Sequence, residues 1–372
     1  MNMRRTAFLI WSAARRLTSV VLLPVMLVAV VVTPALAGSS RRTGTDGAPE
    51  LSIPIGPRGV ALGGAVSSDV TGVESIFWNP AGLGSIQRTE ASFSHQQYIA
   101  DLKLNNASIA TKVGGFGVLA FNAKTLSIGD IFVTTEQAPE GTGEVLNPTF
   151  AVLGVSWGRQ FTDRVRFGAT VNYVSESIAN NSAKGAAFDF GAQYDTGYHG
   201  LKIGMVMKNI GTSMQYSGPG FETNIVPPDA DPTASGRTFS STSASFEMPS
   251  YFQLGMSYDL MRNAQNHVAF VGAFQNNNFS GDELRGGVEW NYKELLALRG
   301  SYYGSFSGHV DPTTGDETST FHSGDDVYTG VALGAGIGMK YGDSGRLGVD
   351  IAWRPVSDLF DDVVDVGVHL AF

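Results

Sequence analysis

The chain has 372 residues, no cysteine and a net charge of −9 at pH 7. The missing cysteine excludes disulfides, thiolate catalysis and cysteine-ligated metals, and the acidic balance argues against a nucleic-acid partner, which requires a basic face. Charged residues make up only 16% of the chain, glycine is frequent with 46 residues, and the mean hydropathy is near zero. This composition indicates a membrane β-barrel, in which apolar and polar side chains alternate along each strand.

The N-terminus has the layout of an export signal. Arginines precede an apolar run over 20–32, and the A-x-A sequence at 35–37 predicts cleavage before Gly38. An uncleaved inner-membrane anchor is the alternative, but the run is short for the ~20 residues of a spanning helix. We therefore expect a signal peptide at 1–37 and a flexible, mostly polar segment at 38–55.

Residues 56–86, which read GPRGVALGGAVSSDVTGVESIFWNPAGLGSI, predict a compact plug, here called the hatch. Small residues alternate through its first part and allow a tight helix or turn to fit among lumen side chains. Asn79-Pro80-Ala81-Gly82 favours a turn, because proline fixes φ and asparagine hydrogen-bonds its own backbone. A soluble linker would leave Ile76-Phe77-Trp78 exposed. We expect Asp69 to cap a helix end or to pair with a lumen arginine.

From residue 87 to the end, bulky apolar residues alternate with small or polar ones, as expected of strands with one apolar face. Such a pattern places the apolar face against lipid and the other face in the lumen of a barrel. About fourteen strands are predicted, near 88–98, 103–112, 115–126, 150–160, 165–175, 186–196, 200–210, 246–260, 266–276, 283–292, 295–304, 329–341, 346–355 and 362–372. The fold class is therefore an all-β antiparallel transmembrane barrel with an N-terminal hatch.

The connections between these strands differ in length. Long connections are predicted at 127–149, 211–245 and 305–328, whereas most others are tight turns. In bacterial barrels the short turns face the periplasm and the long loops face outward. An even number of strands then places both ends of the barrel at the periplasmic side.

The last segment reads VVDVGVHLAF and alternates to the final residue. Val368, Leu370 and Phe372 share its apolar face. A last strand that ends in an aromatic residue resembles the signal recognised by the outer-membrane barrel-assembly machinery. Pairing this strand with the first would close the barrel and remove both edges.

The hatch resembles the N-terminal signature of the PorV/PorQ family, within the FadL-like long-chain fatty-acid transporters. The matching residues are Gly63-Gly64-Ala65, Asp69, Ile76-Phe77-Trp78 and Asn79-Pro80-Ala81-Gly82-Leu83, with a weaker match at Lys208-Asn209-Ile210-Gly211. The rest of the chain matches in strand layout only. The resemblance implies a hatch inside the barrel whose Asn-Pro-Ala turn leads into the first strand.

The same resemblance implies a side opening. In FadL-like transporters an inward kink of the third strand opens a window toward the membrane. Gly115 and Gly117 fall in the third predicted strand and Gly114 directly precedes it, and glycine suits a kink or bulge. These residues are the candidate kink, although glycine is frequent in every strand.

No catalytic or metal site is predicted. Gly154-Val155-Ser156-Trp157-Gly158 matches G-x-S-x-G, but it lies inside an alternating strand, and a nucleophile elbow requires a strand-to-helix turn. The six histidines lack metal-ligand spacing. The acidic loop 309–326 is interpreted as a solvated outer loop, with loose Ca²⁺ binding as the alternative. Aromatic residues near strand ends, such as Trp157 and Trp353, fit an interfacial girdle.

Two functions remain open, and neither is enzymatic or requires a cofactor. The first is uptake or binding of hydrophobic molecules such as long-chain fatty acids, which predicts an apolar cavity between hatch and loops. The second is an accessory barrel of type IX protein secretion, which predicts a plugged lumen and a loop face that binds secreted cargo. Both place the protein in lipid of the bacterial outer membrane. Phe221, Ile225 and Val226 are candidates for an apolar mouth in the longest loop.

Overall fold

The computed structural model describes residues 42, 44–225, 236–310, 317–325, 327–342, 345–357 and 360–372. The chain divides into Met1–Ala37 and Gly38–Phe372, and only the second unit contains described residues. The predicted signal peptide therefore lies outside them. Among the described residues, no helix is long and apolar enough to cross a membrane.

The structure is a closed antiparallel barrel of 14 strands, which confirms the predicted fold class. The sheet closes because β16 pairs with β17, and because the first strand pairs with the last, with Phe93 opposite Val368. The barrel strands are β1 (Glu90–Gln97), β2 (Lys103–Val113), β3 (Gly117–Ser127), β6 (Thr149–Gln160), β7 (Val165–Ile178), β8 (Asn181–Asp195), β9 (Lys202–Gly211), β14 (Tyr251–Arg262), β15 (Asn266–Asn277), β16 (Glu283–Tyr292), β17 (Leu296–Val310), β19 (Val331–Tyr341), β20 (Gly345–Arg354) and β21 (Val363–Ala371).

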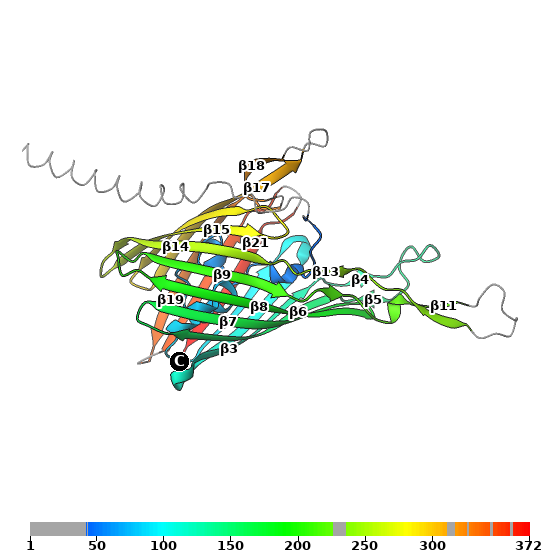
Figure 1. Cartoon of the computed structure of the whole chain (residues 1–372), viewed down its shortest axis with the longest axis horizontal. Helices are drawn as coiled ribbons and strands as arrows, with labels where there is room; N and C mark the ends of the chain where they lie inside the picture. Colours follow the sequence, from blue (N-terminus) through cyan, green and yellow to red (C-terminus); the bar gives the residue numbers. More distant parts are fainter. Residues whose placement is uncertain are drawn as a thin grey trace, which may run out of the picture. The chain divides into compact units, whose positions relative to one another are not determined.

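The long connections carry short hairpins of their own. Figure 1 shows β4, β5 and β11 beyond the ends of the barrel strands. β17 continues past the wall to pair with a further strand. These additional strands are β4 (Ile131–Phe132), β5 (Val145–Leu146), β10 (Met214–Gln215), β11 (Glu222–Ile225), β12 (Arg237–Ser240), β13 (Ser245–Phe246) and β18 (Glu317–Ser323). The predicted distinction between a short-turn end and a long-loop end is therefore present in the fold.

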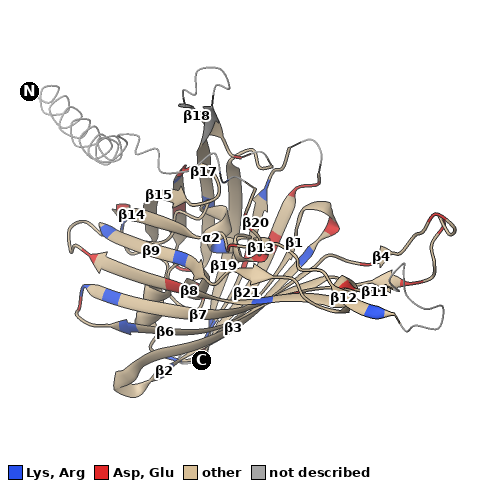
Figure 2. Ribbon diagram, turned by 45° about the vertical axis from the view of Figure 1, so that its right-hand side comes forward, with Lys and Arg blue, Asp and Glu red and all other residues tan. Residues whose placement is uncertain are grey.

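Each barrel strand has an apolar outer face and a small or polar inner face. On β6, Leu153 and Val155 are exposed, whereas Gly154 between them and Ser156 after them are buried. Figure 2 shows the ribbons of β6, β7 and β8 with few charged positions along most of their length. Large apolar side chains are exposed on every barrel strand from β1 to β21 except β15, whose outer side chains are partly covered. The alternation seen in the sequence thus surrounds the barrel with an apolar band.

The hatch lies in the lumen and contacts two different parts of the wall. Its elements are α2 (Pro57–Ala61), α3 (Ser75–Trp78) and the 3-10 helix η3 (Pro80–Ser85). The first helix lies against β17, β19, β20 and β21, whereas η3 lies against β3, β6, β7 and β8. In the sheet order, β1 and β2 separate these two groups of strands on one side and β9 to β16 separate them on the other. The hatch therefore spans the lumen.

The segment before the hatch is packed, which corrects the prediction of a flexible stretch at 38–55. The continuous described part, residues 44–55, is called the strap and contains the 3-10 helix η2 (Pro49–Leu51). Leu51, Ile53 and Ile55 are each buried, and the Lys124 Nζ of β3 donates to the Ile53 carbonyl at 2.6 Å. The apolar residues alternate within this mostly polar segment, and their burial holds it against the wall.

Glycines on the inner wall allow the hatch backbone to approach the strands. Gly158, Gly168 and Gly191 lie opposite one another on β6, β7 and β8 and are called the glycine belt. A Cβ atom at Gly168 would lie less than 3.0 Å from the Pro80 backbone, and one at Gly191 would overlap the Asn79 side chain. Only glycine fits at such an approach, because any side chain would displace η3.

The same close approach recurs elsewhere around the hatch. Cβ atoms at Gly204 on β9 and Gly255 on β14 would each overlap Ser67. A Cβ at Gly334 on β19 would overlap the Ala61 side chain of α2. The hatch is therefore fitted to the inner wall at backbone distance over much of its length.

We predict that Gly168→Ala lowers the stability of the folded barrel by about 1–3 kcal/mol, the usual cost of overpacking. The measurement is the temperature at which the heat-modifiable band unfolds on a denaturing gel. Gly286→Ala on β16 is the matched control, because its Cβ would have no neighbour closer than 3.9 Å. Equal unfolding temperatures for the two variants would show that η3 is not fitted to the glycine belt.

Candidate functional site

Asn79 joins the parts of the hatch. Its side-chain Nδ2 donates to the Ser67 carbonyl at 2.7 Å and to the Ala192 carbonyl of β8 at 3.2 Å. Its Oδ1 accepts from the Ala81 backbone N–H at 3.1 Å and thereby caps η3. Pro80, Ala81 and Gly82 are buried in the first turn of that helix. The structure places this motif as the turn between the hatch core and the chain that leads to β1.

The Gly63–Gly64 pair turns the chain after α2. Both residues adopt positive φ, 62° and 75°, which favours glycine. The Arg285 Nη1 of β16 donates to the Gly63 carbonyl at 2.8 Å, and the Gln253 Nε2 of β14 donates to the Gly64 carbonyl at 3.2 Å. Trp78 is buried beside this turn and meets the Phe77 ring edge-on at 4.9 Å. The predicted motif residues are thus brought together in the lumen.

Asp69 pairs with an arginine of the hatch itself rather than with one from the wall. The Arg58 Nη2 lies 2.9 Å from the Asp69 Oδ2 and 2.8 Å from the Glu289 Oε2 of β16. Arg58 therefore connects the hatch to the wall. Arg58 is not among the residues predicted from the sequence, because its wall partner Glu289 lies 231 positions away.

Further ion pairs continue from Glu289 across the wall. The Glu289 Oε1 lies 2.7 Å from the Arg299 Nε of β17, and Arg299 pairs in turn with Asp350 of β20. The Asp350 Oδ2 lies 3.4 Å from the Nδ1 of His369 on β21. Asp69, Arg58, Glu289, Arg299, Asp350 and His369 are called the ion-pair chain. Glu289, Arg299 and Asp350 are buried, and only complementary pairing of this kind makes buried charges tolerable.

A cavity of about 600 Å³ lies between the hatch, the strap and the long-loop end of the wall. This volume is in the range of about 300–1,000 Å³ that small-molecule sites occupy. One part of its lining is apolar and comes from the hatch, the strap and β3, including Val60, Phe77, Trp78, Ile53 and Leu126. An apolar space at this position is expected if the barrel takes up hydrophobic molecules.

The other part of the lining is polar and aromatic. Tyr303 of β17 and Tyr328 face the cavity together with Arg354 of β20. The Arg354 guanidinium lies 3.7 Å from the Tyr328 ring centroid, and its Nη2 donates to the Tyr303 hydroxyl at 3.3 Å. The Tyr303 hydroxyl donates to Asp325 at 3.0 Å. The cavity therefore has an apolar side and a polar side, as a site for an amphiphile requires.

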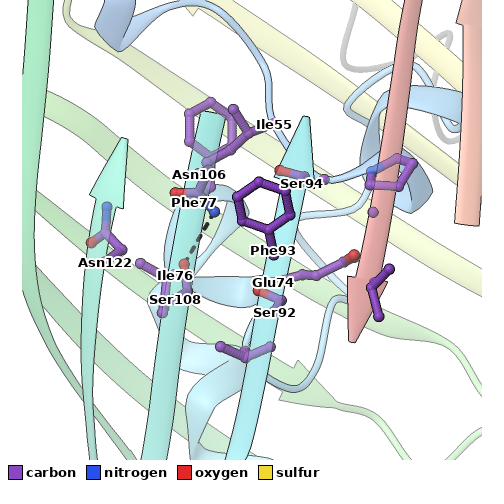
Figure 3. A pocket seen from close by; sticks show the side chains of 15 residues that line it. Ile55, Glu74, Ile76, Phe77, Ser92, Phe93, Ser94, Asn106, Ser108 and Asn122 are labelled. Carbon is purple, nitrogen blue, oxygen red and sulfur yellow. Dashed lines mark hydrogen bonds between the residues drawn. The ribbon is translucent and has the colours of Figure 1, made fainter. Parts of the chain in front are cut away.

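Smaller cavities lie below and beside the hatch. A space of about 20 Å³ separates the hatch from β1, β2 and β3, and Figure 3 shows Ser94 and Asn106 among the residues around it. There the Asn106 Nδ2 donates to the Ser108 Oγ at 3.1 Å, the dashed line in Figure 3. This space has the size of about one water molecule. A pocket of about 110 Å³ at the short-turn end is lined by Asn291, Arg299 and Asp350, among others.

Glu50 of the strap is a buried acid. It faces Glu176 of β7 and Lys124 of β3, and Tyr216 donates to Glu176. Burial is the main cause that raises the pKa of Glu50 from 4.5 to about 7, and Glu176 adds to the rise. The Glu50 backbone N–H and Lys124 act in the opposite direction. The folded barrel thus favours the neutral form of Glu50.

The candidate kink residues lie elsewhere than expected. Gly114 and Gly115 lie in the turn η5 (Gly114–Phe116) before β3, and Gly117 begins the strand. β3 pairs with β2 and with β6 in an unbroken register. This placement corrects the prediction of a kink inside the third strand. The turn connects β2 to β3. Gly114 adopts a positive φ of 48° in that turn, a conformation that favours glycine.

The remaining residues that the sequence singles out lie in ordinary strand positions. Val368, Leu370 and Phe372 are exposed on the outer face of the last strand, and their part in assembly stays a prediction. Ser156 is buried in β6 and lies 2.8 Å from the Thr170 hydroxyl, so it does not sit at a strand-to-helix turn. Among the described residues, no cluster of three or more acids and histidines is placed to hold a metal ion.

Two loop predictions fall partly outside the described residues. Positions 311–316 and 326 of the acidic loop are not described, and neither is Val226 of the predicted apolar mouth. Within the described part, Ile225 is exposed at the end of β11. Phe221 ends the short 3-10 helix η6 (Pro219–Phe221), which precedes β11. Neither residue lines the large cavity.

Solved structures of outer-membrane channels have a fold similar to that of this chain. The chain aligns with the CymD monoaromatic hydrocarbon channel at a TM-score of 0.53 and 12% identity, over 86% of this chain and 97% of that one. The chain shares the fold of the CymD barrel. The Pseudomonas putida toluene transporter TodX aligns at a TM-score of 0.47 and 12% identity, over 84% of this chain and 95% of that one. A Pseudomonas aeruginosa FadL homologue aligns at a TM-score of 0.46 and 12% identity, over 86% of this chain and 97% of that one. No protein-family model and no curated protein matches the sequence.

We predict that Asn79→Ala loosens the hatch. The change removes the 2.7 Å donor of the buried Ser67 carbonyl, which keeps the Gln193 Nε2 at 3.2 Å. It also removes the cap of η3, and the loss of an N-cap costs about 0.5–2 kcal/mol. Entry of small sugars into proteoliposomes, followed by swelling, should become faster than with the unaltered barrel. Asn147→Ala, at an exposed loop position, is the control. Unchanged permeability of a folded Asn79→Ala barrel would contradict the closing role of this residue.

We predict that Glu50 makes the barrel less stable as the pH rises. Because its folded pKa is raised, its stabilising contribution is complete below pH 4.5 and is lost as the pH rises through about 7. Glu50→Gln should therefore unfold at a higher temperature than the unaltered barrel above pH 7, and the two should converge below pH 4.5. Glu140→Gln, at an exposed loop position, should show no such pH-dependent difference. A constant offset of Glu50→Gln at all pH values would contradict the assignment.

Proposed function

We propose that the protein is an outer-membrane channel that takes up hydrophobic small molecules, including amphiphiles such as long-chain fatty acids. The observation that carries the proposal is the cavity of about 600 Å³ between the hatch and the loops. A barrel that served only as a scaffold would have no need of a ligand-sized cavity with an apolar side and a polar side. The shared fold with a hydrocarbon channel supports the same reading.

The outer surface supports a membrane location. Phe121, Leu153 and Phe190 are among many large apolar side chains that are exposed on the barrel wall. A soluble protein rarely exposes a contiguous apolar surface of this extent, whereas a barrel in lipid requires one. Because a closed barrel leaves no strand edge unpaired, its backbone is also compatible with a hydrocarbon environment.

The internal arrangement supports capture before passage. A ligand that enters among the loops reaches the cavity first, since the hatch lies across the lumen below it. The apolar lining, with Phe77 and Leu126, suits an acyl chain or a ring, and the polar lining around Arg354 suits a polar head group. Burial of an acyl chain stabilises the complex by about 0.8 kcal/mol for each CH₂ group. The cavity thus functions as a binding site above a closed passage.

The second candidate is an accessory barrel of type IX protein secretion in the manner of PorV or PorQ. The hairpins at the long-loop end favour it, because apolar side chains are exposed there, including Ile131, Phe132 and Phe239. Exposed apolar groups on projecting loops are typical of protein-binding surfaces. Purification from the native membrane distinguishes the two functions: recovery of the barrel with secreted cargo proteins supports the second, and recovery of the barrel alone counts against it.

We predict that the cavity binds a fluorescent long-chain fatty acid in detergent solution and that Ser280→Trp weakens this binding about tenfold or more. Ser280 lies at the rim of the cavity, so a tryptophan there would fill the space from the loop side. Ser240→Trp adds the same group to β12, whose residues are exposed and line no part of the cavity. Equal affinities for the two variants, or no binding by the unaltered barrel, would overturn the proposal.

A deletion strain provides the matching measurement in cells. Uptake of a radiolabelled long-chain fatty acid should fall in the deletion strain and return with the unaltered gene or with Ser240→Trp. Ser280→Trp should fail to restore it at low ligand concentration. Uptake that does not depend on the gene would exclude the transport function.

A further inference from the structure

Exposed charges are distributed unequally between the two ends of the described barrel. At the long-loop end, ten exposed acids outnumber three exposed bases, Lys103, Lys184 and Arg237. At the short-turn end, eight exposed bases outnumber two exposed acids, Asp163 and Glu294. Figure 2 shows blue positions close to the turn between β6 and β7. The short-turn end is therefore positive, although the whole chain carries a net charge of −9.

Two of the eight bases lie at the turn between β6 and β7. Arg159 is the last residue but one of β6 and pairs with Phe167 of β7, and its guanidinium lies 5.5 Å from the Phe161 ring centroid. Arg164 directly precedes β7, and its Nη1 donates to the Thr196 carbonyl of the β8–β9 connection at 3.4 Å. Both side chains are exposed. The turn therefore presents two cations to its surroundings.

Four aromatic side chains form a continuous cluster beside Arg159. The ring centroids of Phe116 and Trp157 are 6.0 Å apart, and those of Trp157 and Phe161 are 6.1 Å apart. Phe167 extends the cluster, with its centroid 5.6 Å from that of Phe161. Aromatic residues are enriched where lipid tails meet the head groups. The cluster therefore places Arg159 at the head-group depth of the membrane.

Neither arginine forms an ion pair within the described part of the chain. The ion pairs at the short-turn rim involve Arg262, Lys340 and Arg346 instead. Arg159 contacts an aromatic ring, and Arg164 contacts a carbonyl group. A guanidinium carries five N–H donors, so both side chains retain donors for an anion from outside the chain.

We propose that the β6–β7 turn binds the phosphate group of an anionic phospholipid in the periplasmic leaflet, with Arg159 and Arg164 as the cationic contacts. The short turns of bacterial barrels face the periplasm, so these arginines meet the head groups of that leaflet. Arginine suits phosphate because its planar guanidinium donates two parallel hydrogen bonds. The site goes beyond uptake through the lumen and does not depend on it.

The surface next to the two arginines favours a lipid over a soluble anion. Val155 follows Trp157 toward the middle of the outer face of β6, and Phe121 lies opposite Val155 on β3. Val155 and Phe121 are both exposed, so an acyl chain attached to the phosphate can lie along them. A soluble anion would contact only the two cations, whereas a phospholipid contacts the cations and the apolar surface together.

The test compares the binding of two lipids to the purified barrel by native mass spectrometry. The probes are phosphatidylglycerol, which is anionic, and phosphatidylethanolamine, which has no net charge, with identical acyl chains. An arginine near the membrane surface favours an anionic lipid about fivefold. We therefore expect the unaltered barrel to prefer phosphatidylglycerol about tenfold or more, and the double variant Arg159→Gln/Arg164→Gln to lose about tenfold of this preference.

The matched control is the double variant Lys184→Gln/Arg237→Gln, which removes two exposed bases from the long-loop end. It should keep the preference of the unaltered barrel. The heat-modifiable band on a denaturing gel shows whether each variant is folded. Equal binding of the two lipids by the unaltered barrel, or equal losses in the two double variants, would overturn the proposal.

Two additions distinguish a phospholipid site from other sources of the preference. Excess inorganic phosphate should leave phosphatidylglycerol bound, because phosphate gains nothing from the apolar surface; displacement of the lipid would show a site for a soluble anion and contradict the proposal. Raised ionic strength should weaken the preference, since salt screens exposed charges. If Arg159→Gln/Arg164→Gln does not fold, the unaltered barrel decides the matter: a preference that salt leaves unchanged would exclude the two arginines as its cause.

Discussion

The close approach of the hatch backbone to the inner wall is the constraint on which the rest of the structure depends. Gly158, Gly168 and Gly191 lie side by side across β6, β7 and β8 and leave the space that η3 fills. With η3 fixed there, Asn79 can reach both Ser67 and β8, and the remainder of the hatch is carried across the lumen to the opposite strands. A barrel of this size would otherwise be open along its axis. The glycines thus determine that the lumen is divided, and the division creates a cavity with a floor.

The charges on the other wall complement this fit. Glycines of the wall hold the hatch by shape on both sides, since Gly334 and Gly367 approach α2 as closely as the glycine belt approaches η3. On the α2 side, Arg58 and Glu289 add paired charges in a buried setting, where an unpaired charge would be strongly unfavourable. The hatch is therefore held both by shape and by charge.

Much of the fold was predictable because its determinants are local. The alternation of Phe167, Ala169 and Val171 predicts β7 independently of the rest of the sequence. The same local pattern predicts the other barrel strands, and their even number predicts the closure of the barrel. The extension of β17 and its partner β18 was not predicted, because it lies in a long connection without clear alternation. The packing of the strap is not predictable from its composition, because polar residues surround Leu51, Ile53 and Ile55. The turn at Gly114 and Gly115 is not predictable from glycine alone, because glycine is compatible with a strand kink as well as with a turn.

The site was less predictable because its determinants are distant in sequence. Asn79 and Gly63 could be identified from the motif they form, but Arg58 has a partner 231 residues away, and no local pattern indicates that pairing. The glycine belt was likewise hidden among 46 glycines. A signal was nevertheless present: once the predicted strands are paired through their short turns, Gly158 and Gly168 fall opposite each other, and a row of inward glycines marks the place where another segment must approach.

The most direct test of this account is an experimental structure of the barrel purified from its native membrane with its lipids. The account predicts η3 seated on the glycine belt and elongated density in the cavity between Trp78 and Tyr328, with its polar end toward Arg354. Density of that kind would show the divided lumen in its working state, with a ligand bound above the hatch. A hatch outside the lumen, or a cavity filled by the protein's own loops, would contradict the central claim.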